Sequence, residues 1–287
     1  MSNLAQRIAF AVVAIPVTVG VIWWGGWPLA GVVAVLGVLG TREVYDLARH
    51  QNVDPLDGLG FLAAAAIPLA TYWAKGSSAE SRWAEPTLFA GALWVMAVMT
   101  LAMRVRSPQQ RPLAAVAVTI FGPLYASALP AFLIAIRHGA NTGLRNTPAA
   151  ALVILPLALV WICDTAAMAA GSAFGGPKLA PVLSPKKTWA GAIGGTIGAI
   201  AAALVLGLLV VNRLGWSLTA GELLGLGALV AVVGQVGDVA ESLFKREAGV
   251  KDSSALIPGH GGVLDRLDSL YFVIPAAAGL LTLYRLI

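Results

Sequence analysis

Long apolar segments recur along this chain, and they limit what it can fold into more than any other feature. Hydrophobic residues make up 58% of the 287 positions, and charged residues only 11%. A helix that crosses a bilayer needs roughly 20 apolar residues. About nine segments approach that length: 8–24, 28–47, 59–74, 86–103, 112–136, 148–171, 189–211, 217–240 and 268–286. The sequence therefore predicts an all-α fold, a polytopic bundle of membrane-spanning helices.

The basic residues are distributed unevenly between the connecting loops, and this indicates an orientation. The first apolar run follows Arg7 without a convincing small-residue cleavage site, so we interpret it as a retained span. If the N-terminus is cytoplasmic, the cytoplasmic stretches carry about twice as many Lys and Arg residues as the opposite side. This pattern predicts an odd number of spans and a polar site that faces the cytoplasm.

Charge and cysteine content exclude other classes of protein. The net charge of +5 comes from residues spread over many loops, which is not typical of a nucleic-acid site. Cys163 is the single cysteine, so neither an intramolecular disulfide nor a thiolate metal cluster can form. The clustered polar residues lie in the second half. We therefore expect residues 1–150 to form a membrane scaffold and residues 151–287 to form the catalytic region.

The first polar stretch extends from Asp164 to Lys187 and is followed by Thr188. Asp164 follows a long apolar run, and an acidic residue in or at the end of a membrane helix is costly enough to suggest a function. The later segment SPKKT combines hydroxyl and ammonium groups that can bind phosphate oxygens. A helix-end acid and a lysine pair that anchors lipid headgroups are the simpler alternatives.

The second polar stretch is QVGDVAESLFK, at the end of an apolar segment. Asp238, Glu241, Ser242 and Lys245 are spaced i, i+3, i+4 and i+7, so they share one face of a helix. A solvated helix end is the alternative. That alternative explains less well why the polar face starts at Asp238, where the other faces of the helix are still apolar.

The third polar stretch, from Lys251 to Asp268, contains the turn PGHGG. Asp265 and Asp268 follow at i and i+3 on the next helix, where two carboxylates suit Mg²⁺ together with substrate phosphates. His260 is a candidate for proton transfer, for phosphate binding or for a turn role alone. Carboxylates, clustered cations and Gly-rich turns together favour nucleotidyl transfer to a phosphate, which needs positioning and electrostatic stabilisation rather than a covalent nucleophile.

The run from Ser242 to Asp268 resembles the signature of the phosphatidate cytidylyltransferases, the CDP-diacylglycerol synthases. The matching positions are Ser242, Lys245, Arg246, Lys251, Asp252, Pro258, His260, Gly261, Gly262, Asp265, Arg266 and Asp268. The similarity extends upstream through Asp238, Ser184–Thr188 and Asp164, and covers roughly 160–285, whereas the first half resembles the family only in hydropathy and length. Ala190 departs from the family, which commonly has Glu or Gln there, and Ser172 and Gly176 stand where basic residues are often found.

The resemblance implies a membrane enzyme that converts CTP and phosphatidic acid to CDP-diacylglycerol and pyrophosphate with Mg²⁺. It implies metal binding by Asp238, Asp265 and Asp268, and catalytic roles for these residues together with Lys245 and Arg246. Substrate-binding roles are expected for Asp164, Ser184, Lys186, Lys187, Thr188, Ser242, Lys251, His260, Gly261, Gly262 and Arg266. The presence of a second cation, assembly as a homodimer and the sorting of cations between the two substrates stay open.

Two other functions remain as alternatives. The enzyme could act on another lipid phosphate, or the chain could be an ion-coupled transporter that uses Asp164, Asp238 and the adjacent Arg42 and Glu43. The polar residues gather at one face beside a phosphate-type loop, which favours the enzyme. The compact Ala- and Gly-rich chain suggests a bacterial inner membrane.

Overall fold

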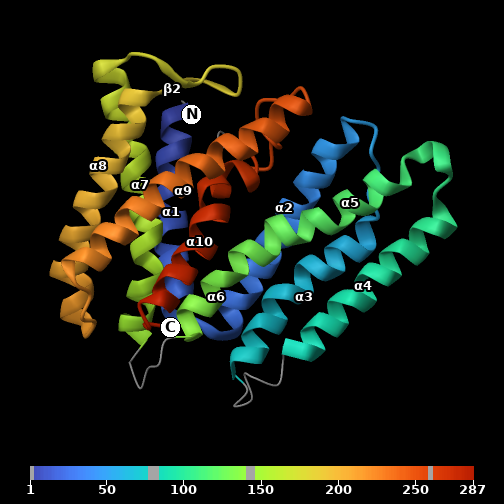
Figure 1. The fold of residues 1–287 in the computed structure, drawn as a ribbon, viewed down its shortest axis with the longest axis horizontal. Helices are drawn as coiled ribbons and strands as arrows, with labels where there is room; N and C mark the ends of the chain where they lie inside the picture. Colours follow the sequence, from blue (N-terminus) through green and yellow to red (C-terminus); the bar gives the residue numbers. More distant parts are fainter. Residues whose placement is uncertain (1–2, 77–83, 140–145, 258–260) are drawn as a thin grey trace. The chain divides into compact units, whose positions relative to one another are not determined.

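The computed structural model describes residues 3–76, 84–139, 146–257 and 261–287, and helices dominate these segments (Figure 1). Each expected span falls largely on helical residues, although those at 217–240 and 268–286 extend by a few residues beyond α9 and α10. The main helices are α1 (Asn3–Trp24), α2 (Gly26–Arg49), α3 (Asp57–Gly76), α4 (Ala84–Val105), α5 (Pro112–Pro123), α6 (Leu129–Gly139), α7 (Asn146–Phe174), α8 (Trp189–Leu206), α9 (Ala220–Glu247) and α10 (Leu264–Leu283). Short 3₁₀ or π segments complete the helical part: η2 (Pro108–Gln110), η3 (Leu124–Ala128), η4 (Gly207–Val211) and η5 (Asn212–Leu214).

Many of these helices are long and apolar enough to cross a membrane. Among the described residues, 7 continuous helical stretches meet that standard, and Val12–Trp24 adds a shorter apolar helix. The π segment η3 joins α5 and α6 into one such stretch, Pro112–Gly139. The prediction of an all-α polytopic membrane protein is confirmed. The number of spans and the side that the polar residues face stay predictions.

A small hairpin between α7 and α8 departs from the helical pattern. Strand β1 (Lys178–Ala180) pairs antiparallel with β2 (Ser184–Thr188), with Lys178 opposite Thr188. Gly175 and Gly176 precede it with φ of +61° and +91°, a region that side chains with a Cβ avoid. Prolines within and beside the strands also oppose a helix. The SPKKT segment is therefore extended, so successive side chains point to opposite faces.

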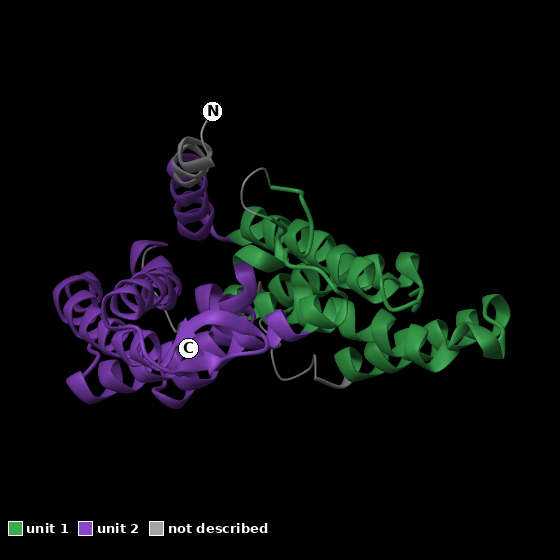
Figure 2. Cartoon of the chain, turned by 90° about the horizontal axis from the view of Figure 1, so that it is seen from above, with its two compact units in different colours: residues 1–11, 26–135, 244–266 green, residues 12–25, 136–243, 267–287 purple. Residues whose placement is uncertain are grey.

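Contacts divide the chain into two compact units, which Figure 2 colours separately. Unit 1 comprises residues 1–11, 26–135 and 244–266, and unit 2 comprises residues 12–25, 136–243 and 267–287. The units interleave along the sequence, and both α9 and α10 contribute to each of them. The expected boundary at residue 150 divides the chain by function and not by contacts, and it stays a prediction.

Tyr45 on α2 centres the packing of unit 1. Its side chain is fully buried, and its hydroxyl donates to the backbone oxygen of Thr119 at 2.8 Å. A Cβ at Gly122 on α5 would lie 2.5 Å from the Tyr45 ring, and one at Gly60 on α3 would overlap the Tyr45 hydroxyl. These two glycines let the three helices pack around one aromatic ring.

Small residues hold α7 against α8 in unit 2. A Cβ at Gly195 would lie 2.9 Å from the Cys163 backbone oxygen, and one at Gly194 would overlap the Ala170 methyl group. Such close approach between small residues is typical of membrane helices, where packing replaces the hydrophobic effect. The tight α7–α8 pair fixes the base from which the hairpin projects.

Candidate functional site

Unit 2 contains a cluster of charged side chains from three elements, which we call the hairpin cluster: Asp164 on α7, Lys187 on β2 and Asp238 on α9. The Lys187 Nζ lies 2.6 Å from Asp238 Oδ2, and the two side chains are 25% and 30% exposed. This contact is an ion pair without the alignment of a hydrogen bond. Asp164 interacts electrostatically with both partners. The structure thus brings together three residues that the sequence predicted from separate stretches.

The local fold explains why Lys187, rather than its neighbour, enters this cluster. Along β2, Lys187 is partly buried and reaches Asp238, whereas Lys186 is exposed. The next residue, Thr188, is 6% exposed and caps α8 by accepting the Gly191 N–H at 3.1 Å. A Cβ at Gly171 on α7 would lie 3.0 Å from the Thr188 hydroxyl, so this glycine makes room for the cap.

Asp268 lies where α10 approaches α9 within unit 2. A Cβ at Gly237 would lie 2.9 Å from the Asp268 backbone oxygen, so only glycine allows this approach next to Asp238. The Asp268 carboxylate accepts the N–H of Ser269 at 2.7 Å. The backbone of Asp268 is therefore held beside the helix that carries Asp238.

Unit 1 contains a second cluster, the loop cluster: Glu43, Lys245, Ser253 and Asp265. Asp265 Oδ1 accepts the Lys245 ammonium at 2.7 Å, and these two side chains are 5% and 9% exposed. Asp265 Oδ2 accepts three hydrogen bonds of 2.8–2.9 Å: the backbone N–H groups of Ser253 and Gly262, and the Ser253 hydroxyl. Both oxygens of this carboxylate are therefore engaged by the chain itself.

Glu43 is the residue that sequence reasoning placed elsewhere. The transporter hypothesis assigns it with Arg42 to an ion path, but its carboxylate accepts four hydrogen bonds from residues of the signature run. The donors are the hydroxyls of Ser253 and Ser254 and the backbone N–H groups of Val263 and Leu264, at 2.7–2.9 Å. The usable signal was an acidic residue within an apolar helix.

The remaining predicted residues are distributed over the surface and interior of the described part. Ser242 is 7% exposed, and Ser184 is half-buried. Arg246 is exposed and donates to the Val250 oxygen at 2.8 Å, while Lys251 and Arg266 are exposed. Gly261 has a φ of +80°, and a Cβ there would lie 2.6 Å from Asp265 Oδ2. His260 and Pro258 lie outside the described residues.

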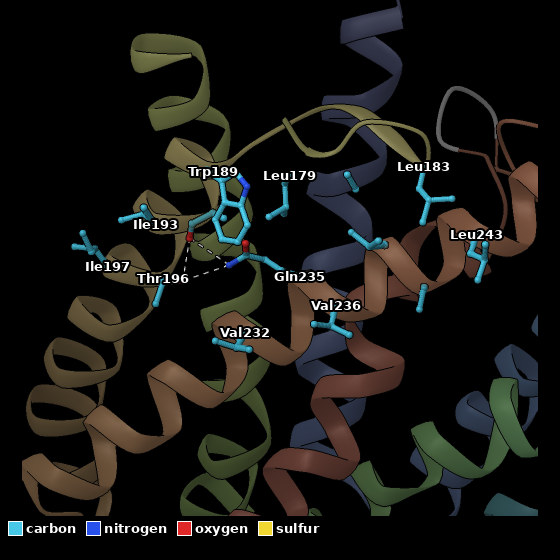
Figure 3. Close-up of a pocket in the computed structure, with 14 residues that line it drawn as sticks. Leu179, Leu183, Trp189, Ile193, Thr196, Ile197, Val232, Gln235, Val236 and Leu243 are labelled. Atoms are coloured by element: carbon cyan, nitrogen blue, oxygen red, sulfur yellow. Dashed lines mark hydrogen bonds between the residues drawn. The ribbon is translucent and has the colours of Figure 1, made fainter. Parts of the chain in front are cut away.

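An apolar cavity of about 660 Å³ lies beside the hairpin in unit 2 (Figure 3). Its walls come from the hairpin, α8 and α9, and include Leu179, Leu183, Trp189, Ile193, Val232, Val236 and Leu243. Gln235 is its main polar side chain, and its amide nitrogen lies 3.3 Å from the Ala192 oxygen and 3.4 Å from the Thr196 hydroxyl. Gln235 precedes Asp238 by about one helical turn. An apolar cavity therefore adjoins a charged cluster.

The carboxylates can be compared with what Mg²⁺ needs, which is few protein oxygens plus water and substrate phosphates. Asp164 and Asp238 fit this demand, since they are two interacting carboxylates opposed by one ammonium group. Asp265 fits less well in this arrangement because its oxygens already face Lys245 and three further donors. Within the described ranges, no group of three or more His, Cys, Asp or Glu side chains forms a metal site. The ligand roles of Asp238, Asp265 and Asp268 stay predictions.

Comparison with known proteins agrees with the signature. A model of the cytidylyltransferase family matches residues 5–284. A phosphatidate cytidylyltransferase of Brucella suis is 35% identical over 99% of this chain and 94% of its own length. One from Synechocystis is 31% identical over 94% of each chain, and one from Haemophilus influenzae is 46% identical over 43% of each. The chain therefore belongs to the cytidylyltransferase family and is a membrane-embedded nucleotidyltransferase.

Proposed function

We propose that this enzyme transfers the cytidylyl group of CTP to phosphatidic acid, forming CDP-diacylglycerol and pyrophosphate. The observation that carries the proposal is the similarity, over 99% of the chain, to a relative named phosphatidate cytidylyltransferase. The retained signature from Ser242 to Asp268 supports it. Family membership also favours an enzyme over the transporter alternative.

The proposed step requires no covalent intermediate with the protein. A phosphate oxygen of phosphatidate bonds to the α-phosphorus of CTP, while the bond from that phosphorus to the oxygen bridging to the β-phosphate breaks. Pyrophosphate leaves with the electron pair. Because a phosphate monoester is anionic at neutral pH, the attacking group needs no base, and the chain's main task is to position two anions that repel each other.

The chain supplies the positive charge that these anions need. Lys187 is held beside Asp238 by the hairpin. Lys186, Arg246, Lys251 and Arg266 are exposed and can contact phosphate oxygens. We assign these cations to the triphosphate and the lipid phosphate together, with Ser184, Thr188, Ser242 and the Gly261–Gly262 turn shaping the binding segments.

A bound Mg²⁺ would screen the phosphates and stabilise the pyrophosphate as it leaves. Asp238 is the proposed principal ligand, with Asp164 as its neighbour and Asp265 and Asp268 as further candidates. Lys187 then holds the Asp238 carboxylate in place through its ion pair.

The apolar cavity beside the hairpin suits an acyl chain of the lipid substrate. Its walls are almost entirely apolar, and its lining residues Val236 and Val239 lie on either side of Asp238 along α9. We propose a bacterial plasma membrane as the location, with the site on the cytoplasmic side. The distribution of basic residues and the bacterial relatives support this location.

A substrate panel tests the proposal and its lipid specificity. Purified protein in nanodiscs is supplied with labelled CTP, Mg²⁺ and either phosphatidic acid or an isoprenoid phosphate. We expect a labelled CDP-lipid with phosphatidic acid. A product with the isoprenoid phosphate alone would show that the enzyme acts on the alternative lipid and not on phosphatidic acid. No product with either lipid would reject the proposed function.

A further inference from the structure

Glu43 is a buried carboxylate whose partners all belong to the signature run. Its side chain lies on α2 and is 3% exposed. Oε1 accepts from the Ser254 hydroxyl at 2.7 Å and the Val263 N–H at 2.9 Å. Oε2 accepts from the Ser253 hydroxyl and the Leu264 N–H, each at 2.8 Å. The carboxylate thus joins both ends of the 253–264 segment across more than 200 residues of sequence.

The chemistry of the segment explains why an anion lies there. Val263 and Leu264 stand at the start of α10, where the first backbone N–H groups have no acceptor within the helix. The positive end of the helix dipole also favours a negative charge. Glu43 satisfies these donors from another helix. Gly262 makes this approach feasible, because a Cβ there would overlap the Glu43 carboxylate and the Ser253 hydroxyl.

Glu43 is also linked to the Asp265 carboxylate. The Ser253 hydroxyl lies 2.8 Å from Glu43 Oε2 and 2.9 Å from Asp265 Oδ2, so its one proton serves two acceptors. Asp265 in turn accepts the Lys245 ammonium. A continuous chain of contacts therefore runs from Glu43 through Ser253 and Asp265 to Lys245.

We propose that Glu43 is a positioning residue for cytidylyl transfer, which holds Ser253, Ser254, Val263 and Leu264 in the arrangement that the reaction requires. This inference rests on the proposed function. Glu43 does not act on substrate, since its oxygens are buried and engaged by the protein. Its contribution is to fix the segment that carries Gly261 and Gly262 and leads into Asp265.

The need for a carboxylate, rather than a side chain of similar shape, follows from the donors. Glutamine has one acceptor oxygen, and its NH₂ group would face a backbone N–H in either orientation: Val263 or Leu264. Serine hydroxyls can rotate to accept, but backbone N–H groups cannot. Aspartate keeps both acceptors on a shorter stem. The acceptor chemistry therefore predicts that Glu43→Asp is milder than Glu43→Gln, although glutamine is the closer match in size.

The test compares Glu43→Gln, Glu43→Asp and the control Glu247→Gln, which makes the same chemical change at an exposed residue of α9. The full-length variants are studied in nanodiscs by steady-state kinetics with CTP and phosphatidic acid, and by amide hydrogen exchange. One unsatisfied buried N–H predicts a loss of about tenfold or more in kcat/KM and a similar rise in exchange at 261–264 for Glu43→Gln. Glu43→Asp should retain more activity, and Glu247→Gln should stay within about twofold of the wild type.

The outcomes separate positioning from other roles. If Glu43→Gln keeps both activity and exchange protection, the inference is overturned; it is also overturned if activity falls while exchange at 261–264 is unchanged. If Glu43→Gln does not fold, Ser254→Ala, which removes one of the four bonds, replaces it and must raise exchange at 261–264. If wild-type protein makes no CDP-lipid, the proposed function fails, while the exchange measurements still decide whether Glu43 holds the segment.

Discussion

Replacing Asp265 by asparagine should abolish turnover without preventing membrane insertion. The carboxylate forms a buried ion pair with Lys245 and accepts three further hydrogen bonds. Removing one partner of a buried pair costs roughly 3–5 kcal/mol, because the other charge is left uncompensated. If that cost falls on the segment around Asp265, the active arrangement becomes roughly two to four orders of magnitude less populated.

The assay measures CDP-lipid formation by Asp265→Asn, Lys245→Met and the double variant in nanodiscs, with amide exchange across 253–267. In the double variant both members of the Lys245–Asp265 pair are neutral, so exchange protection should partly recover relative to either single variant while activity stays low. Activity of Asp265→Asn within about threefold of the wild type would refute the reasoning, since this is far below the loss expected from breaking a buried ion pair. Equal exchange in all four proteins would also contradict it.

Three further perturbations test other parts of the site. Lys187→Met should raise the KM for CTP and lower turnover roughly ten- to a hundredfold. Lys187→Arg should lose less, because it keeps the positive charge beside Asp238. Equal kinetics in the two variants would argue against a role for that charge. Thr188→Ala should lower the unfolding free energy by about 1 kcal/mol in a denaturant titration, whereas Thr165→Ala, at an exposed hydroxyl bonded within its own helix, should change it little. Val236→Trp should fill the apolar cavity and reduce activity on long-chain more than on short-chain phosphatidic acid. Equal losses on the two lipids would show that the cavity does not hold the acyl chain.

Elements of membrane length could be predicted from the sequence because a bilayer imposes a simple requirement on apolar length. Thus α7 was expected with small errors at its ends, whereas α9 continues to Glu247, beyond the expected end at 240. The shared polar face of α9 was also predictable from residue spacing. Whether water or protein covers that face was not: Glu241, Ser242 and Lys245 turn out to be buried, which requires neighbours that spacing alone does not specify.

The long-range pairs could not be predicted from local pattern. Lys186 and Lys187 are the same residue type, and only the folded structure shows that Lys186 is exposed while Lys187 approaches Asp238. Glu43 looked like half of a local pair with Arg42. In the structure, Arg42 is exposed and lies 3.9 Å from Asp46 instead, while Glu43 bonds to residues 210 to 221 positions away. Such contacts depend on tertiary packing, to which a single sequence gives little access.

The fate of each phosphate of CTP tests the central proposal most directly. Purified protein in nanodiscs with phosphatidic acid and Mg²⁺ is given CTP labelled either at the α- or at the γ-phosphate. Cytidylyl transfer predicts that the α-label enters the lipid and the γ-label is released as pyrophosphate, in equal amounts. Appearance of the γ-label in lipid, or release of both labels to water without a lipid product, would contradict the proposed reaction.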